Sequence, residues 1–184
     1  FHRSGGSAGH CGGLAYCADT QSDPNNCGSC GSTCSLGCSS GKCVVNKSYN
    51  LVTSSFTGAS TTTCGGPDFA LSSGPITISW TDTLATTAQV VAVTVQLNWN
   101  ENCDASQDPM TLNGTSVGNI TNGATCSCGG DGIFVVAAQL STVAPYVRGG
   151  ANALQITASK SGGLEGFAAD GTGSLGTVTV SYTP

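Results

Sequence analysis

The chain has 184 residues, which is enough for one sizeable domain and a smaller one. Only 8% of the residues are charged, the net charge is -5, and the five Lys and Arg residues are scattered. We therefore expect no nucleic-acid partner, because phosphate contacts need clustered basic side chains. No stretch approaches the ~20 apolar residues of a membrane span, so we expect no membrane-spanning segment.

Eleven cysteines in a chain of this size indicate an oxidising compartment and a secreted, extracellular protein. Seven of them lie near the N-terminus: Cys11, Cys17, Cys27, Cys30, Cys34, Cys38 and Cys43. Cys27 and Cys30 have the spacing of a zinc-binding pair, but the following cysteines are too crowded for one tetrahedral ion. A redox-active Cys-x-x-Cys motif needs a helix N-terminus, which the surrounding glycines do not favour. We therefore predict disulfides in this segment.

The same run has the pattern CGG…C…DTQSDPNNCGSCG…C…C…GKC between Cys11 and Cys43. It resembles a small cysteine-rich repeat of secreted fungal and myxobacterial proteins, and is similar to the stigma-specific cysteine-rich family of plants. The resemblance covers residues 11–43 and departs only in a longer gap between Cys11 and Cys17. It implies a secreted, disulfide-bonded module, and no catalytic residue comes with it.

The remaining cysteines are Cys64, Cys103, Cys126 and Cys128. Cys126 and Cys128 are too close in an extended segment to pair comfortably with each other. The simplest scheme joins Cys64 and Cys103 to that pair, in either order. Because the total is odd, at least one cysteine of the chain has no intrachain partner. That cysteine is either a buried free thiol or a link to another chain.

The composition divides the chain into three parts: a Gly/Ser-rich arm at 1–10, the disulfide-rich module at 11–45, and a β domain at 46–184. Alternating apolar and polar residues predict strands in the last part. The expected strands are 51–56, 75–80, 90–99, 110–112, a segment from 117, 133–138, 153–157 and 176–182. Asn113-Gly114 is a strong signal for a two-residue hairpin, and residues 141–147 have room for one helical turn. The predicted fold class is mainly β, a small disulfide-rich module followed by an antiparallel β-sandwich.

Two segments of the β domain, residues 112–118 (LNGTSVG) and 146–156 (YVRGGANALQI), share a pattern with known domains. They resemble the galactose-binding-like jelly-roll domains. The resemblance implies a jelly-roll fold, in which many members bind sugar. The turn residues also have a structural explanation, because Gly supplies positive φ and Asn caps a turn.

Three kinds of candidate site follow from residue types. Exposed aromatic and cationic side chains can contact a sugar, and the candidates are Tyr146, Arg148 and Trp99, with Tyr146 expected to be the best exposed aromatic. Glu101, Asp104 and Asp108, which are expected in one acidic loop, are candidate ligands of a Ca²⁺ ion; the alternative is a solvated loop pinned by Cys103. Glycosylation sequons begin at Asn46, Asn113 and Asn119.

The sequence predicts a non-catalytic protein, because the only histidines, His2 and His10, lie in the N-terminal arm. Its main predicted function is that of a structural or adhesive subunit of an extracellular matrix, coat or filament, which involves self-association. The alternative is a carbohydrate- or cell-wall-binding module that uses the loops of the sandwich. No cofactor is expected apart from the candidate Ca²⁺.

Overall fold

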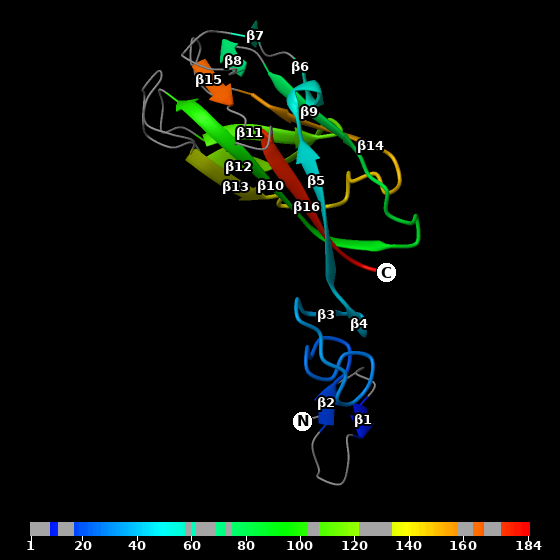
Figure 1. Ribbon diagram of the computed structural model, residues 1–184. Helices are drawn as coiled ribbons and strands as arrows, with labels where there is room; N and C mark the ends of the chain where they lie inside the picture. Colours follow the sequence, from blue (N-terminus) through cyan, green and yellow to red (C-terminus); the bar gives the residue numbers. More distant parts are fainter. Residues whose placement is uncertain are drawn as a thin grey trace. The chain divides into compact units, whose positions relative to one another are not determined.

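The computed structural model describes the backbone of most of the chain (Figure 1). The described residues are 8–10, 17–57, 60–61, 69–72, 75–102, 107–121, 134–157, 164–167 and 174–184. They form two compact units, one of Phe1–Lys47, Thr87–Val91 and Ser181–Pro184, the other of Ser48–Thr86 and Ala92–Val180. The predicted domain boundaries at 10/11 and 45/46 stay predictions.

The first unit contains short strands and disulfides in place of a large apolar core. Its short strands form two antiparallel pairs, β1 (Ala8–His10) with β2 (Cys17–Asp19) and β3 (Cys38–Ser39) with β4 (Lys42–Cys43). Cys27 is the only buried hydrophobic side chain among residues 19–47, all of which the structure describes. The unit therefore depends on covalent links and hydrogen bonds, as its composition predicts.

In its described residues, the β domain contains two sheets and one short 3-10 helix, η1 (Thr53–Ser55). The larger sheet contains β5 (Val45–Leu51), β16 (Gly176–Thr183), β10 (Gln89–Asn102), β15 (Leu164–Phe167), β8 (Phe69–Ser72) and β7 (Ser60–Thr61) in that order, and β13 (Phe134–Gln139) also pairs with β10. The smaller sheet has the order β12 (Thr115–Thr121), β11 (Gln107–Leu112), β14 (Ala151–Ile156), β9 (Ile76–Thr81) and β6 (Phe56–Thr57). The strand pairs whose register is described are antiparallel, which confirms the predicted fold class: a disulfide-rich module followed by a jelly-roll-like β-sandwich.

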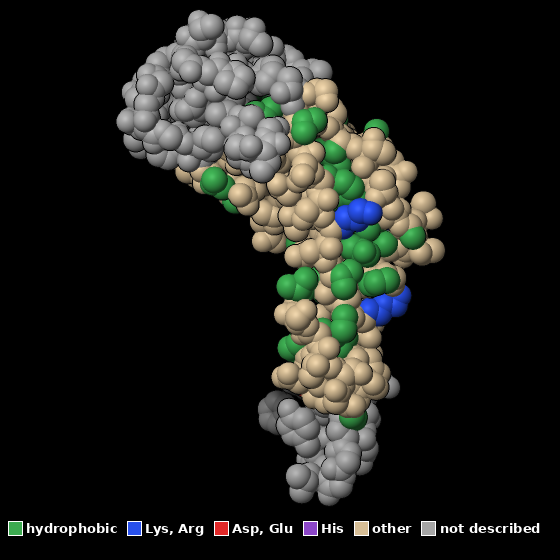
Figure 2. Space-filling model, viewed as in Figure 1, with side chains coloured by type: hydrophobic (Ala, Val, Ile, Leu, Met, Phe, Trp, Pro, Cys, Tyr) green, Lys and Arg blue, Asp and Glu red, His purple; other side chains and the backbone are tan. Residues whose placement is uncertain are grey.

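Alternation along the strands builds the core of the sandwich. In β9, Ile76, Ile78 and Trp80 are buried, while the residues between them are more exposed. The same period of two appears in β11, β14 and β16. Successive side chains of a strand point to opposite faces, so each strand contributes one apolar face to the core. On the face of the molecule in Figure 2, Lys and Arg side chains are isolated and no Asp or Glu is visible among the described residues.

The hairpin predicted at Asn113-Gly114 is confirmed. These two residues connect β11 to β12, and both have positive φ, 50° for Asn113 and 82° for Gly114. Two consecutive positive φ values define the type I′ geometry, whose twist matches that of the flanking strands. The turn therefore fixes the register of β11 against β12.

Two predicted elements are wrong. The strand expected at 51–56 ends at Leu51, because Ser55 turns the chain back onto Val52: the Ser55 N–H donates to the Val52 carbonyl at 2.7 Å, and the Ser55 hydroxyl accepts from the Val52 N–H at 3.2 Å. Residues 141–147, which have room for one helical turn, form a non-helical loop. Within the described residues, no helix has the length and apolarity that a membrane crossing requires.

Candidate functional site

Asp82 is a buried carboxylate directly after β9, with an exposed fraction of 1%. Its Oδ1 accepts hydrogen bonds from the hydroxyls of Tyr49 and Tyr146, the latter at 2.9 Å. Its Oδ2 accepts from the backbone N–H of Gly149 at 2.7 Å and of Leu84 at 3.2 Å. Burial alone would raise the pKa of Asp82, but these hydrogen bonds outweigh it and hold the pKa below its ordinary value. The carboxylate therefore stays ionised. It connects Tyr49 of β5, the segment that follows β9, and the loop that contains Tyr146 and Gly149.

Tyr146 is buried, which corrects the expectation of an exposed aromatic. Its exposed fraction is 8%, and its ring packs against that of Trp80, with centroids 6.3 Å apart. The side chain turns inward because its hydroxyl satisfies the buried carboxylate of Asp82. Burial, followed by the hydrogen bond to Asp82 and then by the charge of that carboxylate, raises the pKa of Tyr146. Tyr146 therefore supports the loop and is not placed to stack on a ligand.

Asn152, at the start of β14, holds the same loop from the other side and is 1% exposed. Its Oδ1 accepts from the Val147 N–H at 2.9 Å, and its Nδ2 donates to the Val147 carbonyl at 2.8 Å. Asn113 in the hairpin turn adds two more links, from its Nδ2 to the Pro145 carbonyl at 2.8 Å and from the Ala153 N–H to its Oδ1 at 2.9 Å. The LNG and GGAN patterns of the sequence therefore have a structural role in this loop.

Between these anchors the loop presents Val147 and Arg148 to solvent. Val147 is 45% exposed, and Arg148 is also exposed. Tyr146 on one side and Gly149 on the other are both hydrogen-bonded to Asp82. We call residues 147–148 the loop tip. An apolar side chain and a guanidinium are thus displayed side by side on a backbone that is fixed on both sides.

The predicted Ca²⁺ ligands do not share one loop. Glu101 lies within β10, which extends past Trp99 because it pairs there with β15, and Asp108 lies within β11, where it is fully buried. Asp104 lies outside the described residues, as do the side chains of Glu101 and Trp99. Ca²⁺ binding and a ligand contact by Trp99 stay predictions.

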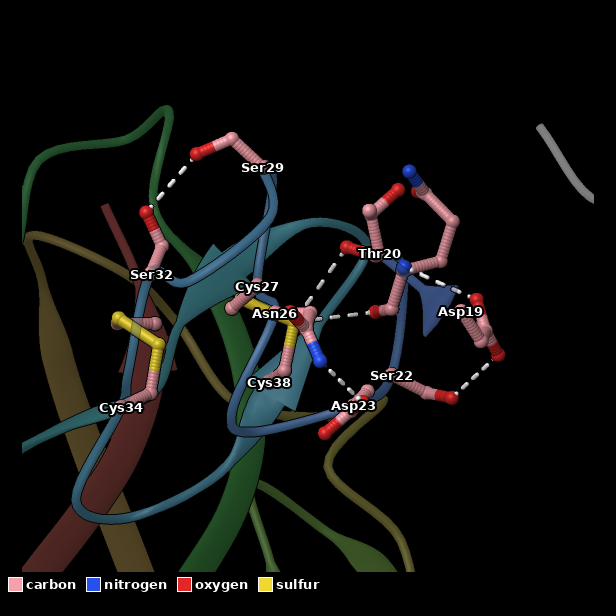
Figure 3. The surroundings of a disulfide bond; sticks show 12 residues. Asp19, Thr20, Ser22, Asp23, Asn26, Cys27, Ser29, Ser32, Cys34 and Cys38 are labelled. Atoms are coloured by element: carbon pink, nitrogen blue, oxygen red, sulfur yellow. Dashed lines mark hydrogen bonds between the residues drawn. A yellow bond between two sulfur atoms is a disulfide. The ribbon is translucent and has the colours of Figure 1, made fainter. Parts of the chain in front are cut away.

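Two disulfides of the N-terminal unit are described, Cys27–Cys38 and Cys34–Cys43 (Figure 3). Cys30 is also disulfide-bonded. The Sγ atoms of Cys27, Cys34 and Cys43 lie within 4.8 Å of one another, close enough for a shared metal ion, but all three are used in disulfide bonds. The disulfide prediction is therefore confirmed for these cysteines. Disulfides of this density fit an extracellular protein.

The other cysteines lie outside the described side chains. This group is Cys11, Cys17, Cys64, Cys103, Cys126 and Cys128. Their pairing, and which cysteine of the odd set lacks an intrachain partner, stay predictions.

The DTQSDPNNCG motif between Asp19 and Gly28 forms a hydrogen-bonded loop (Figure 3). Asp19 accepts from the Ser22 hydroxyl at 2.6 Å, and Asp23 accepts from the Asn26 side chain at 2.7 Å. Both aspartates have a lowered pKa, and in each case these side-chain hydrogen bonds are the largest cause. Gly28 has φ +74°, and a Cβ there would meet the Gly41 carbonyl at 2.5 Å. The motif therefore has a folding role.

The three sequons differ in what their asparagines do. Asn46 and Asn119 are exposed on strands, and the Nδ2 of Asn119 makes one hydrogen bond, to Gln107 at 3.3 Å. The Nδ2 of Asn113 donates both to the Pro145 carbonyl and to Asn152 Oδ1, at 2.8 and 3.1 Å. N-linkage leaves that nitrogen with a single hydrogen, so it can no longer make both bonds.

We therefore expect glycan at Asn46 and Asn119, and none at Asn113, when the protein is secreted from a eukaryotic host. Peptide mapping by mass spectrometry after enzymatic deglycosylation measures the occupancy of each site. An Asn113→Gln variant with unchanged total glycan mass is the control. Substantial occupancy of Asn113 in folded, soluble protein would contradict the expectation.

No known protein family matches the chain. No curated protein is similar to it in sequence. The resemblance of residues 11–43 to a cysteine-rich repeat is therefore not confirmed and stays a prediction.

Several solved structures are similar at low identity. The CBM35 of Cellvibrio japonicus Abf62 has 11% identity and a TM-score of 0.45, over 72% of this chain and 92% of that one. A family 35 carbohydrate binding module from Clostridium thermocellum has 14% identity and a TM-score of 0.38, over 73% and 90%. CsCBM6-3 from Clostridium stercorarium, solved with cellobiose, has 16% identity and a TM-score of 0.35, over 72% and 90%. With these TM-scores, the similarities assign neither a family nor a ligand to this chain.

Proposed function

We propose that the chain is a non-catalytic, secreted carbohydrate-binding module and that its loop tip, Val147 and Arg148, contacts the sugar. The observation that carries this proposal is the anchoring of an exposed tip to two buried polar residues. Asp82 accepts hydrogen bonds from Tyr146 and Gly149, the two residues that flank the tip. Asn152 is hydrogen-bonded to both the N–H and the carbonyl of Val147.

The chemistry of the loop tip suits a hydroxylated ligand. The guanidinium of Arg148 offers several N–H donors in a fixed plane, which match sugar hydroxyls or the carboxylate of an acidic sugar. Val147 offers apolar surface to the C–H face of a sugar ring. Because the backbone is already ordered by hydrogen bonds, binding costs less conformational entropy than it would in a free loop. The ligand class is therefore a polysaccharide bound on a surface of the module.

Replacing Arg148 by alanine is expected to weaken polysaccharide binding by roughly 10- to 100-fold, because a charge-assisted hydrogen bond contributes about 1.5–3 kcal/mol. A panel of neutral and uronate-containing polysaccharides in affinity electrophoresis identifies the ligand, and titration calorimetry measures the change. Lys42→Ala is the matched control, since it removes the same charge from an exposed position in β4. Equal affinity in both variants would reject the loop tip as the site, and no binding to any polysaccharide would reject the function.

The role of a structural or adhesive subunit is the second candidate. One feature of the composition favours it: the chain has eleven cysteines, an odd number, so at least one of them has no intrachain partner and can link to another chain. The two functions are compatible, because a module that self-associates presents more than one loop tip to a polymer.

A further inference from the structure

The two described bridges of the N-terminal unit lie next to each other (Figure 3). The Sγ atoms of Cys27, Cys34 and Cys43 are all within 4.8 Å of one another, so one sulfur of the first bridge lies close to both sulfurs of the second. Cys38 is not a member of this close group. A thiolate released from the second bridge therefore has a disulfide sulfur nearby, which is what thiol–disulfide exchange requires.

The fourth cysteine, Cys38, faces Cys43 across a hairpin. β3 and β4 place these two residues directly opposite each other. The Val44 N–H donates to the Gly37 carbonyl at 3.0 Å, and bonded pairs alternate with non-bonded ones, so Cys38 and Cys43 form a non-hydrogen-bonded pair. The Cα atoms of such a pair are about 4.5 Å apart, within the range that a disulfide allows. The hairpin therefore places Cys38 and Cys43 at a separation that suits a bond between them.

The turn of this hairpin is specified by its own backbone. Ser40 and Gly41 connect β3 to β4, and both have positive φ, 52° and 72°. Two consecutive positive φ values define the type I′ turn, which suits a two-residue hairpin. The Gly41 N–H also donates to the Gln21 carbonyl at 3.1 Å. The turn therefore keeps Cys38 opposite Cys43 during a brief opening of either bridge.

We propose that the N-terminal unit has a second disulfide-bonded state, with the pairs Cys27–Cys34 and Cys38–Cys43, and that a small thiol converts the first state into the second. Residues 35–37 lie inside both loops that the described bridges close, and they lie outside both loops of the second state. Leu36 in this segment is 55% exposed. The exchange therefore makes the covalent constraint on an exposed segment depend on thiol. It is independent of the loop tip.

The exchange proceeds in three steps without net oxidation or reduction. The small thiolate attacks Sγ of Cys43, which is exposed, forms a mixed disulfide with it and releases the Cys34 thiolate. The Cys34 thiolate attacks the nearby Sγ of Cys27, forms the first new bridge and releases the Cys38 thiolate. The Cys38 thiolate attacks Sγ of Cys43 across the hairpin, forms the second new bridge and regenerates the small thiolate. Two protein disulfides break and two form, so the thiol is a catalyst.

The geometry favours this product over the remaining pairing of the four cysteines. Four cysteines allow three connectivities, and the third joins Cys27 to Cys43 and Cys34 to Cys38. That pathway requires the Cys34 thiolate to attack Cys38, which lies outside the close group of sulfurs. It also takes Cys38 away from the partner that it faces in the hairpin. We therefore expect the pairs Cys27–Cys34 and Cys38–Cys43.

Incubation of the folded full chain with a small amount of reduced glutathione tests the proposal. Free thiols are then alkylated, and the chain is unfolded in urea and digested with thermolysin, which cleaves before Leu36 and Val44. In the described state, the peptide of residues 36–43 stays linked to Cys27 and Cys34. In the second state it is released with one internal disulfide, which mass spectrometry detects as a mass two hydrogens below that of the reduced peptide. We expect release after incubation with thiol, none without it, and no net loss of thiol.

A Cys34→Ser and Cys43→Ser double variant is the control, because it keeps only the Cys27–Cys38 bridge and reports how much of that bridge the thiol simply reduces. A parent peptide that stays linked after prolonged incubation would overturn the proposal. Release with two alkylated cysteines would also overturn it, since that result means reduction without exchange. Release only when thiol and urea are present together would assign the exchange to the unfolded chain and reject it for the folded unit.

Discussion

An Asp82→Ala variant is expected to lose about 3–5 kcal/mol of unfolding free energy, the largest effect of a single substitution in the sandwich. The carboxylate accepts four hydrogen bonds in a site that is 1% exposed, and its removal leaves two tyrosine hydroxyls and two backbone N–H groups without their acceptor. A buried donor left unpaired costs about 1–3 kcal/mol, and the costs of neighbouring groups are not fully additive. Urea denaturation followed by tryptophan fluorescence measures the loss.

Tyr146→Phe is the graded control for Asp82→Ala, because it removes one donor and keeps the ring against Trp80. We expect it to cost about 1 kcal/mol. Similar midpoints for Asp82→Ala and the parent chain would mean that the carboxylate does not hold the loops. Asp82→Ala should also bind sugar more weakly, because Asp82 holds the residues that flank the loop tip.

The stabilising effect of Asp82 should also depend on pH. The folded-state pKa lies below the ordinary value of 3.8, so the unfolded chain binds the proton first as the pH falls. The contribution is therefore complete well above pH 3.8 and is lost as the pH falls through the folded-state pKa. The stability difference between the parent and Asp82→Asn should shrink over that acidic window. A constant difference from pH 6 to the acid limit would contradict this assignment.

Removing the Cys27–Cys38 disulfide, by a Cys27→Ser and Cys38→Ser double substitution, is expected to unfold residues 19–47 and leave the sandwich intact. The bridge closes a loop of 11 residues and contributes about 3 kcal/mol by restricting the unfolded chain. Cys27 is also the only buried hydrophobic side chain of that fully described segment, so no apolar core replaces the bridge. Hydrogen exchange read by mass spectrometry should show lost protection in 19–47 and retained protection in β9.

A Ser29→Ala variant is the control for this double substitution. It removes an exposed hydrogen bond to Ser32 of 2.9 Å in the same loop and should leave protection unchanged. Native-like protection of residues 19–47 after loss of the disulfide would show that the hydrogen bonds of the DTQSDPNNCG motif suffice.

The strands of the sandwich could be predicted because their signal is local. Alternation in 75–80 and 176–182, and the Asn113-Gly114 turn, specify strand and hairpin within a few residues. The failure at 51–56 has the opposite cause, since Ser55 closes a turn onto Val52 that apolar patterning does not record. β10 and β11 also extend into the expected acidic loop, because pairing with distant strands overrides the polar composition of that stretch.

The candidate site could be predicted only in part. Arg148 is exposed as expected, but Tyr146 is buried by a partner 64 residues away in the chain. Asp82 was missed because a single aspartate after a strand is typical of an ordinary turn, and its partner Tyr49 lies 33 residues before it. No feature of the neighbouring sequence distinguishes a buried carboxylate such as that of Asp82 from a solvent-exposed one. The sequence pattern from Gly149 to Asn152 did indicate this loop, because Gly149 and Asn152 make hydrogen bonds that hold it in place.

The two disulfides of the N-terminal unit interlace, because Cys34 lies between Cys27 and Cys38, and Cys38 lies between Cys34 and Cys43. Any single peptide bond cut between residues 27 and 43 is therefore spanned by at least one bridge. A protease that nicks this exposed segment once adds the mass of one water and releases no fragment. The module would outlast such damage in an environment rich in secreted proteases and would still be carried by its sandwich.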